Sequence, residues 1–185
     1  NIGVDGSIRA PSGPTNVKLL GDLKVEGKFG VVSSVNLNLS GNTIDASGGE
    51  IALGGTRSLD KITTDNNTTL KVLGSLGLSR IDLGTSKVGD LEFVQIGSSS
   101  PSLSVSGGMG LTVGGTAEIN GYQISHDKGK LTFLSTPSFS NSSTLSVSNG
   151  ELVLQSGGTV NGSTLSLSAS VFKPTGTVSV TNGGT

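Results

Sequence analysis

The sequence Leu23-Lys24-Val25-Glu26-Gly27-Lys28-Phe29-Gly30 has the pattern Leu-x-Val-x-Gly-x-apolar-Gly, which returns at residues 70–77 and 103–110. Two apolar residues at i and i+2 place both side chains on one face of a strand, and the following glycine lets the backbone turn or be approached closely. A looser copy, residues 111–117, follows the third at once. Each copy predicts a short strand that ends at a tight bend, so the motif indicates a building unit of the fold.

The composition points to a thin core. Hydrophobic residues are 32% of the 185 residues and aromatic residues 3%, whereas 30 residues are Gly. A globular domain with one thick core uses more large apolar side chains. Charged residues are only 14% and Val, Ile and Thr are frequent, which is unlike a disordered chain. The composition therefore favours a β-rich chain that buries narrow rows of small aliphatic side chains, as fibres and solenoids do.

Charge and hydropathy limit the partners. The formal net charge is −1, which provides no basic surface for nucleic acid or anionic lipid. There is no cysteine, so disulfides and thiolate metal sites are excluded. No run approaches the roughly 20 apolar residues of a membrane span, so we expect no membrane insertion.

Since the sequence begins at Asn1 without a signal-peptide pattern, we expect a processed or excised part of a longer protein.

Three regions follow along the chain. Residues 1–16 read as an extended lead-in with two prolines, and residues 17–131 as a β-repeat region with charged outer faces. The loop we expect in that region lies near residues 56–69, where Asp65-Asn66-Asn67 favours a turn. The dipeptides Asn120-Gly121 and Lys128-Gly129 are further turn signals. No window shows a helical apolar stripe, so we predict no long helix.

Residues 132–185 form a Ser/Thr-rich, weakly charged β region, in which Glu151 and Lys173 are the only charged residues. Edge strands of monomeric proteins usually carry charge that blocks pairing with other chains. This region is therefore either a surface on which another subunit or the next segment packs, or a weakly charged solvated face.

The alternation assigns a set of apolar residues to the interior, where they would form the core of an assembly. These predicted assembly-core residues are Leu23, Val25, Phe29, Leu37, Leu39, Leu70, Val72, Leu103, Val105, Leu111, Val113 and Ile119.

The spacing of the motif argues against a regular single-chain stack. The three best copies begin at residues 23, 70 and 103, which gives unequal intervals of 47 and 33 residues. A single-chain β-helix usually keeps a steadier repeat length. The intervals favour a fibre or filament whose units vary in length.

No constellation in the sequence predicts catalysis. The single histidine, His126, precedes Asp127 in an expected turn, and no nucleophile motif surrounds any serine, so we interpret His126 as a solvated turn residue. The glycines of residues 107–110 resemble a phosphate-binding loop only superficially, because no Gly-Lys-Ser/Thr follows. We therefore predict no catalytic, cofactor-binding or metal-binding residue, no cofactor and no enzymatic activity.

The short Leu-x-Val-x-Gly units, with segments such as residues 111–121, resemble the stalk repeats of bacteriophage tail fibres and related viral fibres. The resemblance implies three identical chains wound into an elongated β-structured shaft, with apolar rows meeting at the axis. It also implies that a host-surface glycan or protein is recognised through another region, and that the protein is extracellular, in a virion tail fibre or a cell-surface filament.

Two other resemblances compete. Residues 35–49 are similar to the rungs of secreted filamentous adhesins, which are single-chain β-helices. A third option is a β-sandwich subunit of an extracellular filament or pilus, in which one chain donates a strand to its neighbour.

The sequence thus predicts an all-β, elongated fibrous architecture of many short strands with glycine turns, favoured as an intertwined homotrimeric shaft. The alternatives are a strand-donating β-sandwich subunit and a single-chain β-solenoid. The expected function is a non-enzymatic structural fibre, a tail-fibre-like shaft subunit for host or surface attachment. The alternative is a subunit of a self-assembling extracellular filament or pilus, or a surface adhesin. In each case the main partner is the chain itself.

Overall fold

The computed structural model describes residues 6–8, 15–31, 35–38, 42–58, 62–79, 85–95 and 100–185. These residues form strands, turns and irregular connections, and none of them is helical. Every strand pair recorded among them is parallel, including the long pair of β15 with β17. The prediction of an all-β, elongated fold is confirmed, and the parallel stacking is that of a β-solenoid.

Most strands belong to one of three faces, which we call face A, face B and face C. Face A contains residues 55–58 of β7 (Glu50–Ser58), residues 75–79 of β9 (Thr69–Ser79), β12 (Ser102–Ser106), residues 123–127 of β15 (Gln123–Phe133), residues 144–148 of β17 (Thr144–Leu154) and β19 (Thr164–Ser168). Face B contains β10 (Thr85–Val88), β13 (Gly110–Val113), residues 129–133 of β15, residues 150–154 of β17 and β20 (Val171–Pro174).

Face C contains β1 (Gly6–Ile8), β4 (Lys28–Val31), residues 50–53 of β7, residues 69–73 of β9, β11 (Leu91–Val94), β14 (Glu118–Asn120), β16 (Ser138–Ser140), β18 (Gly158–Asn161) and β21 (Val178–Thr181). A bridge between Leu91 and Ala117 joins the two parts of this face. Near the start of the chain, β2 (Thr15–Lys18) pairs with β5 (Val35–Asn38), while β6 (Ile44–Asp45) lies between β3 (Leu23–Lys24) and β8 (Ile62–Thr63).

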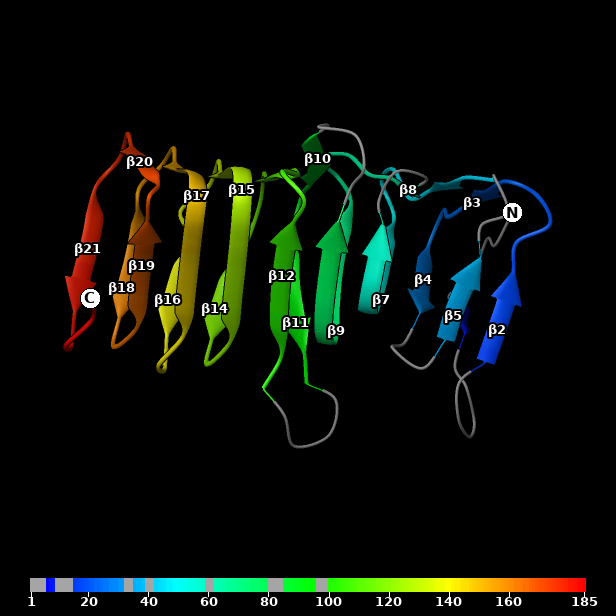
Figure 1. Ribbon diagram of the computed structural model, residues 1–185, viewed down its shortest axis with the longest axis horizontal. Helices are drawn as coiled ribbons and strands as arrows, with labels where there is room; N and C mark the ends of the chain where they lie inside the picture. Colours follow the sequence, from blue (N-terminus) through cyan, green and yellow to red (C-terminus); the bar gives the residue numbers. More distant parts are fainter. Residues whose placement is uncertain are drawn as a thin grey trace.

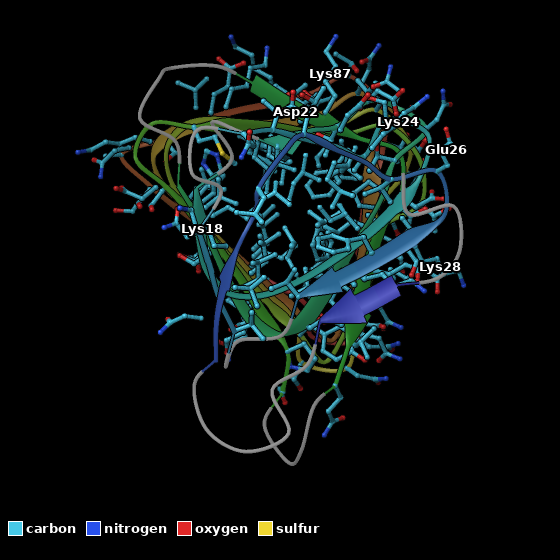
Figure 2. The ribbon with its side chains drawn as sticks, turned by 90° about the vertical axis from the view of Figure 1, so that its right-hand side faces the viewer. Lys18, Asp22, Lys24, Glu26, Lys28 and Lys87 are labelled. Carbon is cyan, nitrogen blue, oxygen red and sulfur yellow. The ribbon has the colours of Figure 1, made fainter. Side chains whose placement is uncertain are left out.

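From residue 69 onward the chain visits face C, face A and face B in turn, so each circuit is one rung of the solenoid. The rungs stack along the longest axis of the molecule, with β2 near one end and β21 at the other (Figure 1). Viewed along that axis, side chains fill the interior, and the charged residues Lys18, Lys24 and Lys28 lie on the outside (Figure 2).

The rung length explains the unequal motif spacing. Gln123 and Thr144 occupy equivalent positions on adjacent rungs and are 21 residues apart, whereas Ser75 and Ser102, also paired in register, are 27 residues apart. The motif copies at residues 23, 70 and 103 start strands in different sheets or faces, namely β3, face C and face A. The intervals of 47 and 33 residues are therefore not rung lengths, and the argument from them against a single-chain stack is wrong.

The core is one continuous column of mostly aliphatic side chains that runs through the rungs. Rows of equivalent positions build it: Leu103, Ile124 and Leu145 follow one another on face A, and all three are buried. The rings of Phe133 and Phe139 meet edge to face, with centroids 6.2 Å apart. Because each inward residue packs on the rung before and after it, small aliphatic side chains suffice to exclude water.

The predicted turn signals form corners of the solenoid. At Lys128-Gly129 both residues have positive φ, 61° and 79°, and β15 continues from face A onto face B. A Cβ on Gly129 would lie 2.7 Å from the carbonyl oxygens of Gly108 and Met109 on the rung below. Glycine is required there by both conformation and space, and the expected turn is a corner across which β15 continues.

The expected loop near residues 56–69 is only partly a loop. Residues 56–58 continue β7, and Ile62 and Thr63 form β8. The predicted turn at Asp65-Asn66-Asn67 is confirmed: the Thr68 N–H donates to the Asp65 carbonyl at 3.1 Å, and the Asn67 N–H donates to Asp65 Oδ1 at 2.9 Å.

Candidate functional site

The predicted assembly-core residues mostly lie inside the column. The buried ones are Val25, Phe29, Leu70, Val72, Leu103, Val105, Leu111, Val113 and Ile119. Leu23 is half-buried against the core. Leu37 belongs to β5 but its side chain is not described, and Leu39 lies outside the described residues. The rungs of one chain bury these nine side chains, and their role in joining several chains stays a prediction.

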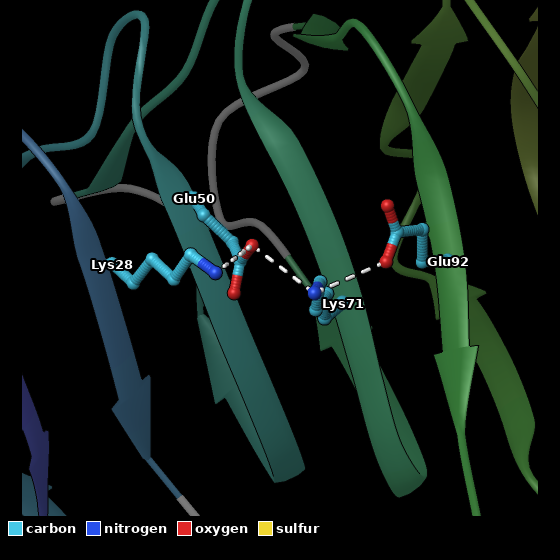
Figure 3. Close-up of polar contacts among 4 residues, drawn as sticks. All are labelled: Lys28, Glu50, Lys71 and Glu92. Atoms are coloured by element: carbon cyan, nitrogen blue, oxygen red, sulfur yellow. Dashed lines mark ion pairs between the residues drawn. The ribbon is translucent and has the colours of Figure 1, made fainter. Parts of the chain in front are cut away.

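A ladder of ion pairs crosses four neighbouring strands of face C (Figure 3). Glu50 Oε2 on β7 lies 3.8 Å from Lys28 Nζ on β4 and 3.1 Å from Lys71 Nζ on β9. Lys71 Nζ also lies 3.2 Å from Glu92 Oε2 on β11. Charges therefore alternate in sign along the stack, and each inner member has partners on both neighbouring rungs.

The central lysine of this ladder is held in its charged form. The hydrogen bond to Glu50 is the main cause that raises the pKa of Lys71, with a further contribution from Glu92, while partial burial opposes the shift. The side chains of Lys71 and Glu50 are 24% and 19% exposed, so this pair is less screened by solvent than the outer members. The ladder ties β7, β9 and β11 together.

A second, shorter ladder lies on face B. Glu151 on β17 contacts Lys130 on β15 at 3.2 Å and Lys173 on β20 at 2.8 Å. The hydrogen bond from Lys173, followed by that from Lys130, lowers the pKa of the Glu151 carboxyl. The region of residues 132–185 has two charged residues, Glu151 and Lys173, and both therefore connect neighbouring rungs.

Two asparagine pairs join neighbouring rungs at the corner between faces C and A. The side-chain Nδ2 of Asn141 donates to Asn120 Oδ1 at 2.5 Å, and that of Asn182 donates to Asn161 Oδ1 at 2.6 Å. Next to this corner Ser143 is buried, and its hydroxyl donates to the Ile119 carbonyl at 2.6 Å. Polar side chains at the corners thus bond to the rung below.

The interpretation of His126 as a solvated turn residue is wrong. His126 lies in β15 and its side chain is fully buried, although Asp127 beside it faces outward and binds Ser148 and Asn149. In register with His126 stand Val105 on β12 and Val147 on β17. The alternation Ile124, His126 marks an inward position in the sequence, and the turn expected around His126 concealed it.

A shallow groove follows the corner between faces A and B. It has a volume of about 560 Å³, and glycines line much of it, among them Gly108, Gly129 and Gly150. Its charged members, Lys130 and Glu151, pair with each other. The groove results from the absence of side chains where the chain turns the corner. Its charged side chains connect neighbouring rungs.

The described part of the chain contains no metal-binding cluster. Within residues 6–8, 15–31, 35–38, 42–58, 62–79, 85–95 and 100–185, no three His, Asp or Glu side chains gather closely enough to hold a metal ion. In the same ranges no helix has the length and apolar character needed to cross a membrane.

The last rung exposes apolar side chains. Leu167 on β19 is 37% exposed, Val171 on β20 is 52% exposed and Val180 on β21 is 53% exposed. Thr185 pairs with part of the free edge of β19, since its N–H donates to the Ser163 carbonyl at 2.9 Å. Within the described residues, no further strand pairs with β19, β20 or β21 on this side.

Comparison with known proteins gives no relative: no family model, no curated protein and no solved structure matches the chain.

Proposed function

We propose that the chain is a non-enzymatic structural rod that spans distance between an anchored end and a surface to be attached. The observation that carries the proposal is the unbroken parallel stack around one column of buried side chains. The polar side chains of the chain support the proposal, because the ion-pair ladders and the asparagine pairs join neighbouring rungs. The proposal takes the chain to be extracellular, in a virion tail fibre or a cell-surface filament, with a host-surface glycan or protein bound through another region.

In this proposal the stiff unit is the single-chain solenoid. The intertwined homotrimeric shaft predicted from the sequence is a finer version of the same function. Sedimentation velocity and multi-angle light scattering separate the two forms. An elongated monomer supports the single rod and an elongated trimer supports the shaft, whereas a compact particle of either mass contradicts the proposal.

Removal of one rung tests whether the stack is the working unit. Deletion of residues 123–143 joins Tyr122 to Thr144, which occupies the register position of Gln123 on the next rung. We expect this variant to fold cooperatively into a shorter rod. The matched control removes residues 123–133 and so breaks the order of the faces; we expect it to unfold. Equal behaviour of the two deletions in urea would show that register stacking does not organise the chain.

The second candidate function, a subunit of a self-assembling filament, is favoured by the exposed apolar side chains of the last rung. Leu167→Lys combined with Val180→Lys should abolish any filaments seen by electron microscopy, because two buried charges would face the incoming rung. Ser166→Lys places the charge on the outer surface of β19 and is the control. Filaments that persist in the double variant would exclude this surface as the contact.

A further inference from the structure

His126 occupies an aliphatic position of the core. Its side chain is 0% exposed, and its register neighbours on the adjacent rungs are Val105 and Val147, each 1% exposed. Met109, also fully buried, belongs to the connection after β12. His126 is the only titratable side chain among the buried residues of the described chain.

The single hydrogen bond of the imidazole fixes the tautomer of the neutral ring. Nε2 lies 3.1 Å from the Met109 carbonyl oxygen, and a carbonyl only accepts, so Nε2 carries the hydrogen. Nδ1 is buried and has no hydrogen-bond partner. The neutral ring therefore leaves one acceptor unused. A proton on Nδ1 would add both a buried donor without an acceptor and a positive charge.

We propose that His126 is an acid-sensitive weak point of the solenoid, at which protonation loosens the contact of β15 with β12 and β17. The neutral imidazole is compatible with the aliphatic column, and the imidazolium is not. Below neutral pH the stack therefore opens first around this rung. The proposal concerns the stability of the stack and is independent of the role of the rod.

The surrounding charges do not compensate an imidazolium. The strands β12, β13 and β19 contain no ionisable residue. On β15, Lys130 pairs with Glu151 of β17 at the surface of face B, and Lys128 lies at the corner. The carboxylate that acts on the ring is that of Asp127, which lies outside the column and accepts bonds from Ser148 and Asn149.

Burial is the main cause that lowers the pKa of His126, against smaller opposing effects of the Met109 carbonyl and Asp127. The unfolded chain then takes up a proton near pH 6.5 while the folded chain does not. Stability is complete above that pH and falls as the pH decreases toward the folded value, with the unfolding constant rising by up to about tenfold per pH unit. The carboxyls with lowered pKa, such as those of Asp65 and Asp127, lose their contribution only below about pH 4.

The experiment measures urea unfolding of the full chain between pH 7.5 and pH 4.5. We expect the unfolding constant of the natural sequence to rise steeply below pH 6.5 and that of His126→Val to stay nearly constant. The double variant Ser125→His, His126→Val keeps one histidine but places it on the exposed side of β15. We expect its unfolding constant to depend on pH as little as that of His126→Val.

Hydrogen exchange at pH 5 locates the opening. Amides of β12, β15 and β17 should exchange faster than at pH 7 after correction for intrinsic rates, and those of β7 should not. The proposal is overturned if the natural sequence and His126→Val have the same pH dependence, or if the surface histidine restores the slope. It is also overturned if protection is lost uniformly along the stack.

Discussion

Asn141 Nδ2 donates to Asn120 Oδ1 at 2.5 Å, across one full rung of the solenoid. The same bond recurs between Asn182 and Asn161, so the corner between faces C and A has two separate amide pairs, each of which joins two neighbouring rungs. Asn141 and Asn182 also have positive φ, 52° and 51°, a conformation that asparagine tolerates better than most residues. Asparagine therefore provides both the left-handed backbone conformation of the corner and the hydrogen bond that holds the corner to the preceding rung.

This dual role predicts graded effects at Asn141. Asn141→Ala should lose about 2 kcal/mol, because it removes the bond and strains a left-handed residue. Asn141→Gly should lose only about 1 kcal/mol, since glycine adopts the conformation freely. Urea unfolding of both variants checks the order, and a glycine variant as unstable as the alanine variant would contradict the role of conformation.

Three glycines allow the effect of backbone conformation on stability to be measured apart from the effect of steric contact. Gly21 has no positive φ, and a Cβ added to it would meet no atom within 4 Å. Gly48 has the same free space but a φ of +74°. Gly129 has a φ of +79°, and a Cβ added to it would lie 2.7 Å from backbone oxygens. We expect Gly21→Ala to be neutral, Gly48→Ala to lose about 1 kcal/mol, and Gly129→Ala to lose several times more. Thermal unfolding gives the ranking, and equal losses at residues 48 and 129 would exclude rung contact as a cause.

The face C ladder should contribute through its central lysine. Lys71→Gln breaks two ion pairs and should lose about 1 kcal/mol at low salt, whereas Lys24→Gln, whose pair with Glu26 is about half exposed, should lose almost nothing. Because the pKa of Lys71 is raised in the folded chain, its contribution is complete below about pH 10.4 and disappears as the pH rises through the folded value.

Urea unfolding at low and high salt and across that pH range provides the measurement for Lys71→Gln. The difference from the natural sequence should shrink at high salt and at high pH. A difference that is insensitive to both would mean that Lys71 acts through packing of its methylene groups.

Adjacent residues on one strand should differ sharply. Val25 is 0% exposed, whereas Lys24 is exposed, so Val25→Asp should unfold the local rungs and cost several kcal/mol while Lys24→Ser should be nearly silent. Circular dichroism and urea unfolding of the two variants test the inward and outward assignment. Comparable losses would refute it.

The alternation of apolar residues was sufficient to predict an all-β chain and most inward positions, because a strand alternates its side chains whatever it pairs with. It could not identify the pairing partner. Leu70 and Leu103 begin the same motif yet lie on different faces, since what each contacts depends on the residues one rung away. Asn120 recurs at Asn161 and Asn141 recurs at Asn182, both after 41 residues, which is two rungs, and this recurrence is the signal that would have revealed the repeat.

The buried histidine shows what a local pattern leaves out. The alternation with Ile124 marks His126 as inward, but the register alone gives it Val105 and Val147 as neighbours, about one rung away in each direction. The ladders are likewise invisible locally, because Glu50 and Lys71 meet only through the register of β7 and β9. Local sequence predicts which way a residue faces, and the register decides what it meets.

The parallel stacking also has a mechanical consequence. Tension applied along the long axis acts in the direction of the hydrogen bonds between neighbouring rungs, so the rungs carry the load in series and detach one at a time. Each detached rung of about 20 residues releases roughly 70 Å of extended polypeptide in exchange for one strand spacing of about 4.8 Å. A rod of this kind lengthens under load in discrete steps and absorbs a sudden pull before its ends are torn from what they hold.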